Sequence, residues 1–389
     1  MKVTHIITRL VIGGAQENTV ATVLGLRQKS GIEVNLISGP TIGPEGSLEP
    51  EVKKIPGLLT IVPSLVRPVH PLKDFLALRR LEKILREQKP DIVHTHSGKA
   101  GILGRLAAKR AGVPVIIHHI HGPSFGNFQN AIANFIFTTA ERRAARVTTH
   151  FICSAQAMTR IYLAAGIGKP EMFTRIFSGF HLKPFLEAQN DLALREKLGI
   201  PADAFVIGKI ARLFKLKGHE DLFAAFQKLL PQCPNARLLL VGDGSLRTHL
   251  ENRAREMNLA NKIIFTGVVP PNEVPRYVGI MDCLAHLSSR EALSRALPQA
   301  LAAGKPVVAY DFDGADEICL NAKTGFLVRT GDVATVAQKL FQLANDSELR
   351  KRLGQNGQEF VRENFPVEQM IDSIYNLYLK LATGRGIHL

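Results

Sequence analysis

Apolar runs and amphipathic segments alternate along both halves of this 389-residue chain, and this alternation limits the fold more than any other feature. Six apolar runs in the first half are predicted to be strands: VTHIIT, VNLIS, LLTIV, DIVHTH, VPVIIHH and THFICS. Six more follow in the second half: AFVIGKI, ARLLLVG, NKIIFTG, DCLAHL, KPVVAYD and GFLVR. Strands that alternate with helices predict an α/β fold built on doubly wound parallel sheets.

The length of the chain predicts two domains, because a single core rarely grows beyond about 250–300 residues. Periodicity lapses at residues 179–191, so we place a linker there. The predicted domains are residues 1–180 and 181–365, and residues 366–389 contain a last helical pattern, VEQMIDSIYNLYLKLA.

Charge is distributed unevenly between the two halves. The formal net charge is +15; residues 1–180 carry 23 Lys and Arg against 11 Asp and Glu, and residues 181–389 carry 26 against 23. An excess of positive charge in one half indicates an anionic partner or serves solubility. Nucleic acid is not expected, since aromatic residues for base stacking are scarce on the basic segments.

Composition also bounds the setting of the protein. The four cysteines are scattered without disulfide or zinc spacing, which favours a reducing cytosol. No apolar run approaches the roughly 18 residues that a membrane helix needs, and the N-terminus is predicted to be a strand that enters a Gly loop rather than a signal peptide. The expected location is cytoplasmic.

Residues 288–311, SSREALSRALPQALAAGKPVVAYD, place a Glu on a short loop before a helix and a buried strand. The helix is predicted to begin near Leu293 or Ser294 and to end at Ala303, with Gly304 as its C-cap. Glu291 precedes the free backbone N–H groups of that helix. A carboxylate beside such groups suits a sugar hydroxyl next to phosphate oxygens.

Two cations follow the strand at the start of the second half. In IARLFKLKGHEDL, Arg212 and Lys217 stand five residues apart, before a helix predicted to begin at about Gly218. Cations at the carboxyl end of a strand can grip a diphosphate and stabilise the charge that grows as it leaves. An exposed basic helix entry is the simpler alternative.

Two glycine loops end predicted strands. Gly13 and Gly14, followed by Gln16, come after the first strand, and Gly242-Asp243-Gly244 ends LLLVG. Such loops let the backbone approach an anionic ligand, although tight turns without a ligand explain them about as well.

Histidines gather on two neighbouring predicted strands. His94, His96 and Lys99 belong to HTHSGKAG, and VIIHHIHG contains His118, His119 and His121. Alternation puts His94 and His96 on one face of their strand. Because no carboxylate or cysteine stands at ligand spacing, no metal is expected here.

In their order along nearly the whole chain, these motifs resemble retaining GT-B glycosyltransferases, specifically glycosyltransferase family four. That family has Glu, seven residues and a second Glu; Glu291 matches the first, whereas Gln299 takes the second place and Ala292 replaces the usual Gly. The resemblance implies the GT-B architecture, with two Rossmann-like domains facing across a cleft. The acceptor domain would be 1–180, the donor domain 181–365, and the helix in 366–389 would cross back.

The resemblance implies a role for each matching residue. Arg212 and Lys217 would hold the departing diphosphate, Glu291 would bond a donor-sugar hydroxyl, and His121 would face the donor sugar. Further positions implied near the donor are Gly13, Gly14, Gly242, Asp243, Val268 (through its backbone), Ala292, Leu293, Ser294, Arg295 and Gln299. Gln lacks the charge of Glu, so we expect a loss of about 1–2 kcal/mol of nucleotide affinity.

The implied reaction is transfer of a hexose from a nucleotide diphosphate sugar, with UDP favoured, to an acceptor hydroxyl with retained anomeric configuration. The acceptor would be a lipid-linked or cell-envelope glycan, as in polysaccharide biosynthesis. No cofactor is expected: Asp311-Phe312-Asp313 resembles a metal-binding Asp-x-Asp but closes a predicted strand. Two alternatives stay open, a GT-B nucleotide-sugar epimerase and a catalytically silent nucleotide-sugar binder.

A basic surface is expected on the first half, where an acceptor or an anionic membrane would lie. The helical pattern at 71–88 turns six apolar residues to one face: Leu72, Phe75, Leu76, Leu81, Ile84 and Leu85. Residues assigned to the acceptor or membrane surface are Gln16, His96, Lys99, Arg79, Arg80, Arg142 and Arg143. Peripheral association with the inner face of a membrane follows if these residues meet lipid.

Overall fold

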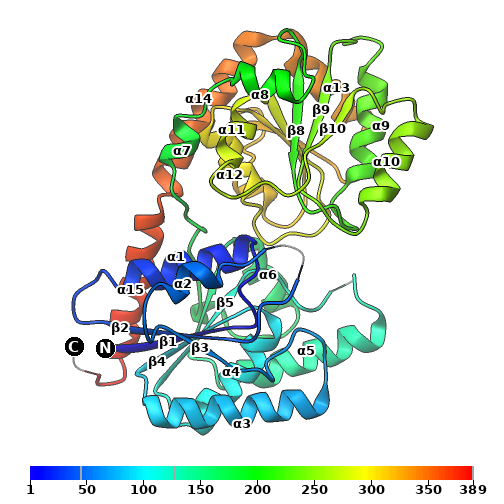
Figure 1. Ribbon diagram of the computed structural model, residues 1–389. Helices are drawn as coiled ribbons and strands as arrows, with labels where there is room; N and C mark the ends of the chain where they lie inside the picture. The colour runs from blue at the N-terminus through cyan, green and yellow to red at the C-terminus, as the bar shows by residue number, and fades with distance from the viewer. Residues whose placement is uncertain (44–45, 127, 388–389) are drawn as a thin grey trace. The chain divides into compact units, whose positions relative to one another are not determined.

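The computed structural model describes residues 1–43, 46–126 and 128–387, which form two compact units (Figure 1). Unit 1 comprises Met1–Phe180 and Val367–Leu389, and unit 2 comprises His181–Pro366. The chain therefore passes from one unit to the other after Phe180 and returns after Pro366.

Unit 1 contains a seven-stranded parallel sheet in the order β3-β2-β1-β4-β5-β6-β7. Its strands are β1 (Lys2–Ile7), β2 (Glu33–Ser38), β3 (Leu59–Ile61), β4 (Ile92–His96), β5 (Val115–Ile120), β6 (His150–Cys153) and β7 (Phe173–Arg175). Its α-helices are α1 (Gly14–Leu26), α2 (Glu49–Lys53), α3 (Pro71–Gln88), α4 (Gly98–Arg110), α5 (Ala131–Ala145), α6 (Gln156–Ala164) and α15 (Val367–Thr383).

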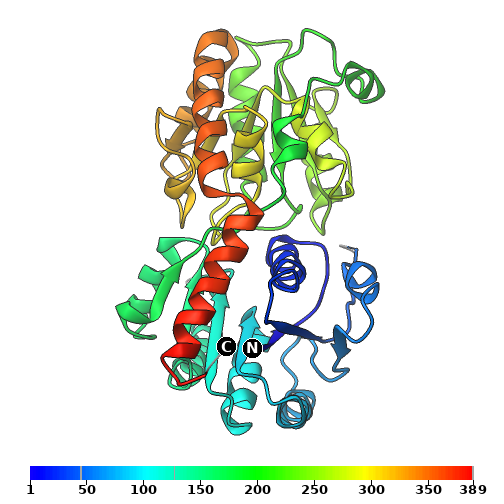
Figure 2. The same cartoon turned by 90° about the vertical axis from the view of Figure 1, so that its left-hand side faces the viewer.

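Two apolar cores cover the two faces of this sheet. Alternate strand residues such as Ile6 and Val93 pack with α3 and α4, whereas Val3 and Ile92 pack with α1 and α15. Helix α15 lies against α1 (Figure 2). Lys29, which follows α1, forms an ion pair with Asp372 of α15. The last helix of the chain thus completes the core of the first unit.

Unit 2 contains a six-stranded parallel sheet in the order β10-β9-β8-β11-β12-β13. Its strands are β8 (Val206–Ile210), β9 (Arg237–Val241), β10 (Ile263–Phe265), β11 (Cys283–His286), β12 (Val307–Tyr310) and β13 (Gly325–Val328). Its α-helices are α7 (Lys183–Leu186), α8 (Leu192–Lys197), α9 (His219–Leu229), α10 (Arg247–Glu256), α11 (Val274–Gly279), α12 (Ala296–Ala302), α13 (Val333–Asn345) and α14 (Ser347–Asn364).

All twelve predicted strands are confirmed, and the class is two parallel-sheet α/β domains. The edge strand β7 was not predicted, because its three residues, FTR, lack an apolar run. Gly304 has φ 69° after α12, as expected for a C-cap glycine.

Two predicted helices differ from the structure. Helix α12 begins at Ala296 rather than near Leu293, because Pro298 has no backbone N–H and fits only the first turn of a helix. In α3, Leu81, Ile84 and Leu85 are buried, but Leu72, Phe75 and Leu76 are exposed. The single apolar face predicted for α3 is therefore wrong in its first two turns.

Candidate active site

In unit 2, polar side chains from two loops meet beyond the carboxyl ends of β8 and β11. The loop after β8 carries Arg212 and Lys217 and ends at Gly218, whose φ is 68°. A side chain at Gly218 would overlap the carbonyl group of Leu287, which follows β11. Glycine therefore lets these two loops lie in direct contact.

The ammonium of Lys217 pairs with the carboxylate of Glu291 across these loops. Ser288 Oγ lies 3.1 Å from the carbonyl oxygen of Leu216 and 3.4 Å from Glu291 Oε1. His286 Nε2 is 3.9 Å from the same carboxylate oxygen. The structure thus brings together two of the residues that the sequence assigned to catalysis.

Arg212 lies at the entrance of the same loop and is exposed. Its guanidinium lies 4.8 Å from the ring centroid of Phe214, a distance typical of a cation–π contact. His219 at the start of α9 donates from Nε2 to the Arg212 carbonyl oxygen at 3.1 Å. The backbone at Arg212 is therefore anchored while its side chain stays on the surface.

Asp313 is a residue of this site that the sequence did not predict. Its place in Asp311-Phe312-Asp313 suggested only a resemblance to a metal-binding Asp-x-Asp. Its Oδ2 accepts a hydrogen bond from the Glu291 backbone N–H at 2.9 Å. Burial raises the pKa of Asp313 to about 6, although this hydrogen bond acts in the opposite direction. Asp313 therefore fixes the backbone at the residue that carries the central carboxylate.

The glycine loop after β9 packs beside the Arg212 loop. Gly242 has φ 134°, and a side chain there would overlap the carbonyl of Ala211. Asp243 accepts from the backbone N–H of Gly244 at 2.7 Å and from Arg247 at 3.2 Å. Asp243 thus stabilises its own turn, while Val268 on the neighbouring loop is 56% exposed.

The predicted nucleotide-binding run spans the approach to α12 and its first turns. Ala292 and Ser294 are buried, Leu293, Arg295 and Gln299 are half-buried, and Ser294 Oγ lies 3.5 Å from His286 Nδ1. Gln299 lies within α12, which the start at Ala296 leaves seven residues long.

Lys209 in β8 is a second residue that the sequence did not single out. It is 1% exposed, and its ammonium nitrogen has no hydrogen-bond partner among the described residues. Burial lowers the pKa of Lys209 to about 7, helped by Lys217 and opposed by Glu291 and Asp221. Asp221 itself accepts from Tyr310 Oη at 2.7 Å. An apolar strand pattern gave no signal for this buried amine.

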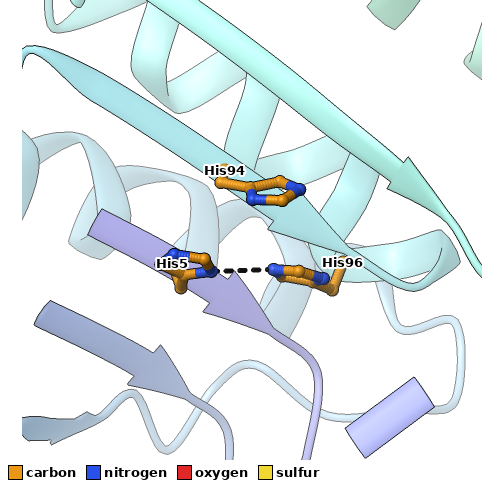
Figure 3. A group of neighbouring side chains, drawn as sticks. All are labelled: His5, His94 and His96. Atoms are coloured by element: carbon orange, nitrogen blue, oxygen red, sulfur yellow. Dashed lines mark hydrogen bonds between the residues drawn. The ribbon is translucent and has the colours of Figure 1, made fainter. Parts of the chain in front are cut away.

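In unit 1, strand register assembles a cluster of histidines. His5 in β1 pairs in register with His94 in β4, and His96 pairs with His119 in β5. Residues in register share a face of the sheet, so these side chains lie together; Figure 3 shows His5, His94 and His96. The cluster faces the core that contains α1 and α15, and Tyr378 of α15 contacts it.

Hydrogen bonds connect the cluster to His121, which follows β5. His5 Nδ1 lies 2.9 Å from His96 Nε2, and His96 Nδ1 lies 3.1 Å from His121 Nε2. His119 stacks on His121 with 4.1 Å between ring centroids. His118 lies on the other face, 3.0 Å from Thr95 Oγ1. His121 is therefore the end of a buried polar array.

Burial keeps these imidazoles neutral. It lowers the pKa of His5 and of His121 to about 3, and it holds the pKa of His94, His96 and His119 well below the ordinary value. Neutral imidazole is both donor and acceptor, so each ring can continue a hydrogen-bonded chain.

Two trios of ring nitrogens are close enough to be considered as metal ligands: His5, His94 and His96, and His96, His119 and His121. Two nitrogens on a tetrahedral zinc are about 3.4 Å apart when each bond is about 2.1 Å. The 2.9 Å between His5 and His96 instead fits a hydrogen bond. Each trio consists of imidazoles, without a carboxylate to offset a buried dication.

The remaining predicted residues of unit 1 occupy separate places. Gly13 precedes α1, with Gly14 as its first residue and Gln16 in its first turn. Lys99 is held by Asp74 at 2.5 Å and by the Pro68 carbonyl. His96 is fully buried, so its assignment to an acceptor or membrane surface is wrong: its ring is enclosed by strands β1 and β5. Four arginines predicted for this surface are exposed on α3 and α5: Arg79, Arg80, Arg142 and Arg143.

Comparison with known proteins agrees with this arrangement. The family described as "Glycosyl transferases group 1" matches residues 190–360, and the "Glycosyl transferase 4-like domain" matches residues 13–174. An Escherichia coli relative, UDP-Gal:alpha-D-GlcNAc-diphosphoundecaprenol alpha-1,3-galactosyltransferase, is 29% identical over 83% of this chain and 84% of its own. A Staphylococcus aureus capsular polysaccharide biosynthesis glycosyltransferase is 26% identical over 86% and 89% of the two chains.

A solved structure also shares the fold. HepE of Anabaena, in complex with UDP and glucose, has a TM-score of 0.83 at 21% identity and covers 98% of this chain and 100% of its own. Among the described residues, no helix combines the length and apolar character needed to cross a membrane. The two family matches, the relatives and the two parallel-sheet domains together show that the chain belongs to the GT-B glycosyltransferases of the family-four type.

Proposed function

We propose that this glycosyltransferase moves a hexose from a UDP-sugar to a hydroxyl of a lipid-linked or cell-envelope glycan, with retained anomeric configuration. The observation that carries the proposal is the pairing of Lys217 with Glu291 beyond the carboxyl ends of β8 and β11, where Lys217 comes from the loop that also carries Arg212. Ligands of parallel sheets bind at such ends.

The charges of this cluster suit the parts of a nucleotide sugar. Arg212 and Lys217 stabilise the negative charge that grows on the departing diphosphate. Glu291 accepts a hydrogen bond from a hydroxyl of the donor sugar, and its pairing with Lys217 keeps the carboxylate beside the phosphate site. Asp313 holds the Glu291 backbone during the reaction.

The bond changes balance without a separate protein base. The bond from the anomeric carbon to the phosphate oxygen breaks as the acceptor oxygen attacks from the same face. A leaving phosphate oxygen takes the acceptor proton, and Arg212 and Lys217 retain the diphosphate. Two protein cations supply the charge that the diphosphate requires.

The relatives support the choice of donor and acceptor. The Escherichia coli relative is named for UDP-Gal and a diphosphoundecaprenol-linked sugar, and the HepE structure contains UDP and glucose. The Staphylococcus aureus relative is named for capsular polysaccharide biosynthesis. These names favour UDP over other nucleotides and a glycan acceptor linked to the cell envelope.

Thermal unfolding with UDP-, GDP- and ADP-sugars tests the donor site. A ligand at one hundred times its dissociation constant stabilises a protein by about 2.7 kcal/mol. UDP-sugars are expected to raise the Tm of the wild type but not of Arg212→Ala/Lys217→Ala. The control variant is Lys215→Ala, which changes an exposed lysine of the same loop and should keep the rise in Tm. No shift of the wild type with any donor would contradict the proposal.

Two amphipathic helices of unit 1 further suit an anionic membrane. The apolar side chains Leu72, Phe75, Ile132 and Phe135 are 63%, 56%, 75% and 71% exposed on α3 and α5. These helices also carry the exposed arginines. Exposed apolar residues beside arginines are typical of helices that lie in a lipid surface.

Sedimentation with phosphatidylglycerol vesicles tests this second part of the proposal. Phe75→Glu/Phe135→Glu should release the protein from vesicles, whereas Leu192→Glu, which changes an exposed leucine of unit 2, should not. If both variants sediment with the vesicles as the wild type does, α3 and α5 are not the lipid-binding helices.

A further inference from the structure

We propose that Tyr378, His5 and His96 form a hydrogen-bonded chain that determines which ring nitrogen of His121 carries its proton. Only the consequence for catalysis rests on the proposed function, with His121 facing the donor sugar as the family resemblance implies. The three chain members would be positioning residues, since they act through His121.

The links of the chain are close and continuous. Tyr378 Oη lies 3.4 Å from His5 Nε2, His5 Nδ1 lies 2.9 Å from His96 Nε2, and His96 Nδ1 lies 3.1 Å from His121 Nε2. A branch joins Tyr378 Oη to His94 Nδ1 at 2.5 Å. Each neutral ring has one N–H, so a ring that donates at one nitrogen must accept at the other.

This rule couples the tautomers of the rings. If His121 donates from Nε2, then His96 accepts at Nδ1 and donates from Nε2 to His5, which in turn donates from Nε2 to Tyr378. If the direction is reversed, all three rings carry their proton on Nδ1. A mixed arrangement would place two hydrogens or two lone pairs against each other, which is costly inside a dry core.

The contacts of Tyr378 select the direction. O–H donors form hydrogen bonds of about 2.5–3.0 Å, shorter than those of N–H donors. The 2.5 Å contact therefore fits donation from Tyr378 Oη to His94 Nδ1. A hydroxyl has one hydrogen, so its oxygen is then left to accept from His5 Nε2, which lies 3.4 Å away. In this direction His5, His96 and His121 all carry the proton on Nε2.

The fold isolates the chain from other proton partners. His5, His94, His96 and Tyr378 are fully buried, and sheet register sets the distance between their strands. Burial also lowers the pKa of each histidine, which removes the doubly protonated state that would interrupt the chain.

The consequence is a lone pair at His121 Nδ1. A ring in this state accepts a hydrogen bond and selects a hydroxyl of the donor sugar, whereas the other tautomer would select an acceptor group. Through this hydrogen-bonded chain, Tyr378 in α15, the last helix of unit 1, affects the chemistry at the end of β5.

Nitrogen NMR of the histidine rings in the full-length protein tests the proposal directly. In the wild type, His5, His96 and His121 are expected to carry their protons on Nε2. In Tyr378→Phe, which removes only the hydroxyl, His121 is expected to show both tautomers. Tyr375→Phe is the matched control, because Tyr375 lies on the same helix with its hydroxyl 3.4 Å from the Ser30 carbonyl, outside the chain.

Kinetics adds a readout that a packing role would not give. If the proposed function holds, Tyr378→Phe should lower kcat/KM for the donor sugar by about tenfold, the value of roughly one hydrogen bond. Tyr375→Phe should leave kcat/KM unchanged.

Three results would overturn the proposal: Nδ1 protonation in the wild type, His121 signals in Tyr378→Phe identical to the wild type, or a stoichiometric zinc ion bound through these nitrogens. The ring signals need no turnover, so they test the chain separately from the enzymatic activity. If the protein proves not to transfer a sugar, the tautomer result would be unaffected.

Discussion

The two units carry opposite chemistry at the same place in similar sheets. In unit 1, the carboxyl ends of β4 and β5 hold neutral, buried imidazoles that bond to one another. In unit 2, the loops after β8 and β11 hold Arg212, Lys217 and Glu291, which are charged and partly exposed. The difference separates two tasks: neutral groups fix positions and protons, and charged groups stabilise a charge that changes during the reaction.

Burial explains why each set has its own character. An ionised group buried without a partner is costly, so the enclosed cluster uses imidazoles that stay neutral. Lys217 and Glu291 keep 15% and 29% of their side chains exposed, where water and pairing both support the charges. Lys209 differs from these charged residues, because it is an amine of unit 2 buried as deeply as the histidines of unit 1.

The largest expected effect comes from removing both cations of unit 2. Arg212→Ala/Lys217→Ala should lower kcat by about 10⁴-fold, since each group that meets developing charge contributes about 10²–10³-fold and neighbouring effects do not add fully. Steady-state kinetics with Lys215→Ala as the control measures it. A double variant that changes only KM would show that the cations bind the ground state and transition state equally.

The next effect concerns Lys209 and the stability of unit 2. Burial lowers its pKa from 10.5 to about 7, so the folded state disfavours the ammonium that the unfolded chain carries below pH 10.5. The resulting destabilisation grows as pH falls from 10.5 towards 7 and then stays constant.

Lys209→Met should therefore raise the free energy of unfolding by about 4 kcal/mol at pH 7 and by only about 1 kcal/mol at pH 10. Denaturant unfolding at the two pH values measures the difference. An equal increase in the free energy of unfolding at both pH values would show that the Lys209 amine is not desolvated. Lys209 would then not be comparable with the buried histidines of unit 1.

The smallest effect sharpens the account of the donor site. Gln299→Glu restores the carboxylate that the family pattern has at this place, and it should raise UDP affinity about tenfold through a charge-assisted hydrogen bond. Calorimetric titration with UDP measures the change. An unchanged or weaker affinity would mean that Gln299 does not contact the nucleotide.

Local patterns predicted the strands well, because buried parallel strands leave continuous apolar runs such as KPVVAYD. They also pointed to Lys217 and Glu291, whose pairing the structure shows. The first turns of α3 were expected to share one apolar face with the later turns, but at 100° per residue Leu72, Phe75 and Leu76 lie on the side of the helix opposite to Leu81, Ile84 and Leu85.

Contacts distant in sequence were beyond such patterns. Nothing in the segment around His5 indicates that it meets His96, and Tyr378 belongs to the other end of the chain. Asp313 acts through one hydrogen bond from the Glu291 backbone, and the spacing of residues along the chain does not indicate this contact. His5 and Tyr378 became apparent only when the sheet order placed β1 beside β4 and the packing placed α15 beside α1.

The most direct test of the central claim is a transfer assay with UDP-hexoses and a diphosphate-linked polyprenol sugar as acceptor, with the product followed by proton NMR. We expect UDP release, a new glycosidic bond with the anomeric configuration of the donor, and loss of both in Arg212→Ala/Lys217→Ala. Tight donor binding without transfer or hydrolysis would contradict the proposed transferase function and indicate a silent binder. Scrambling at one sugar carbon without an acceptor would instead indicate an epimerase.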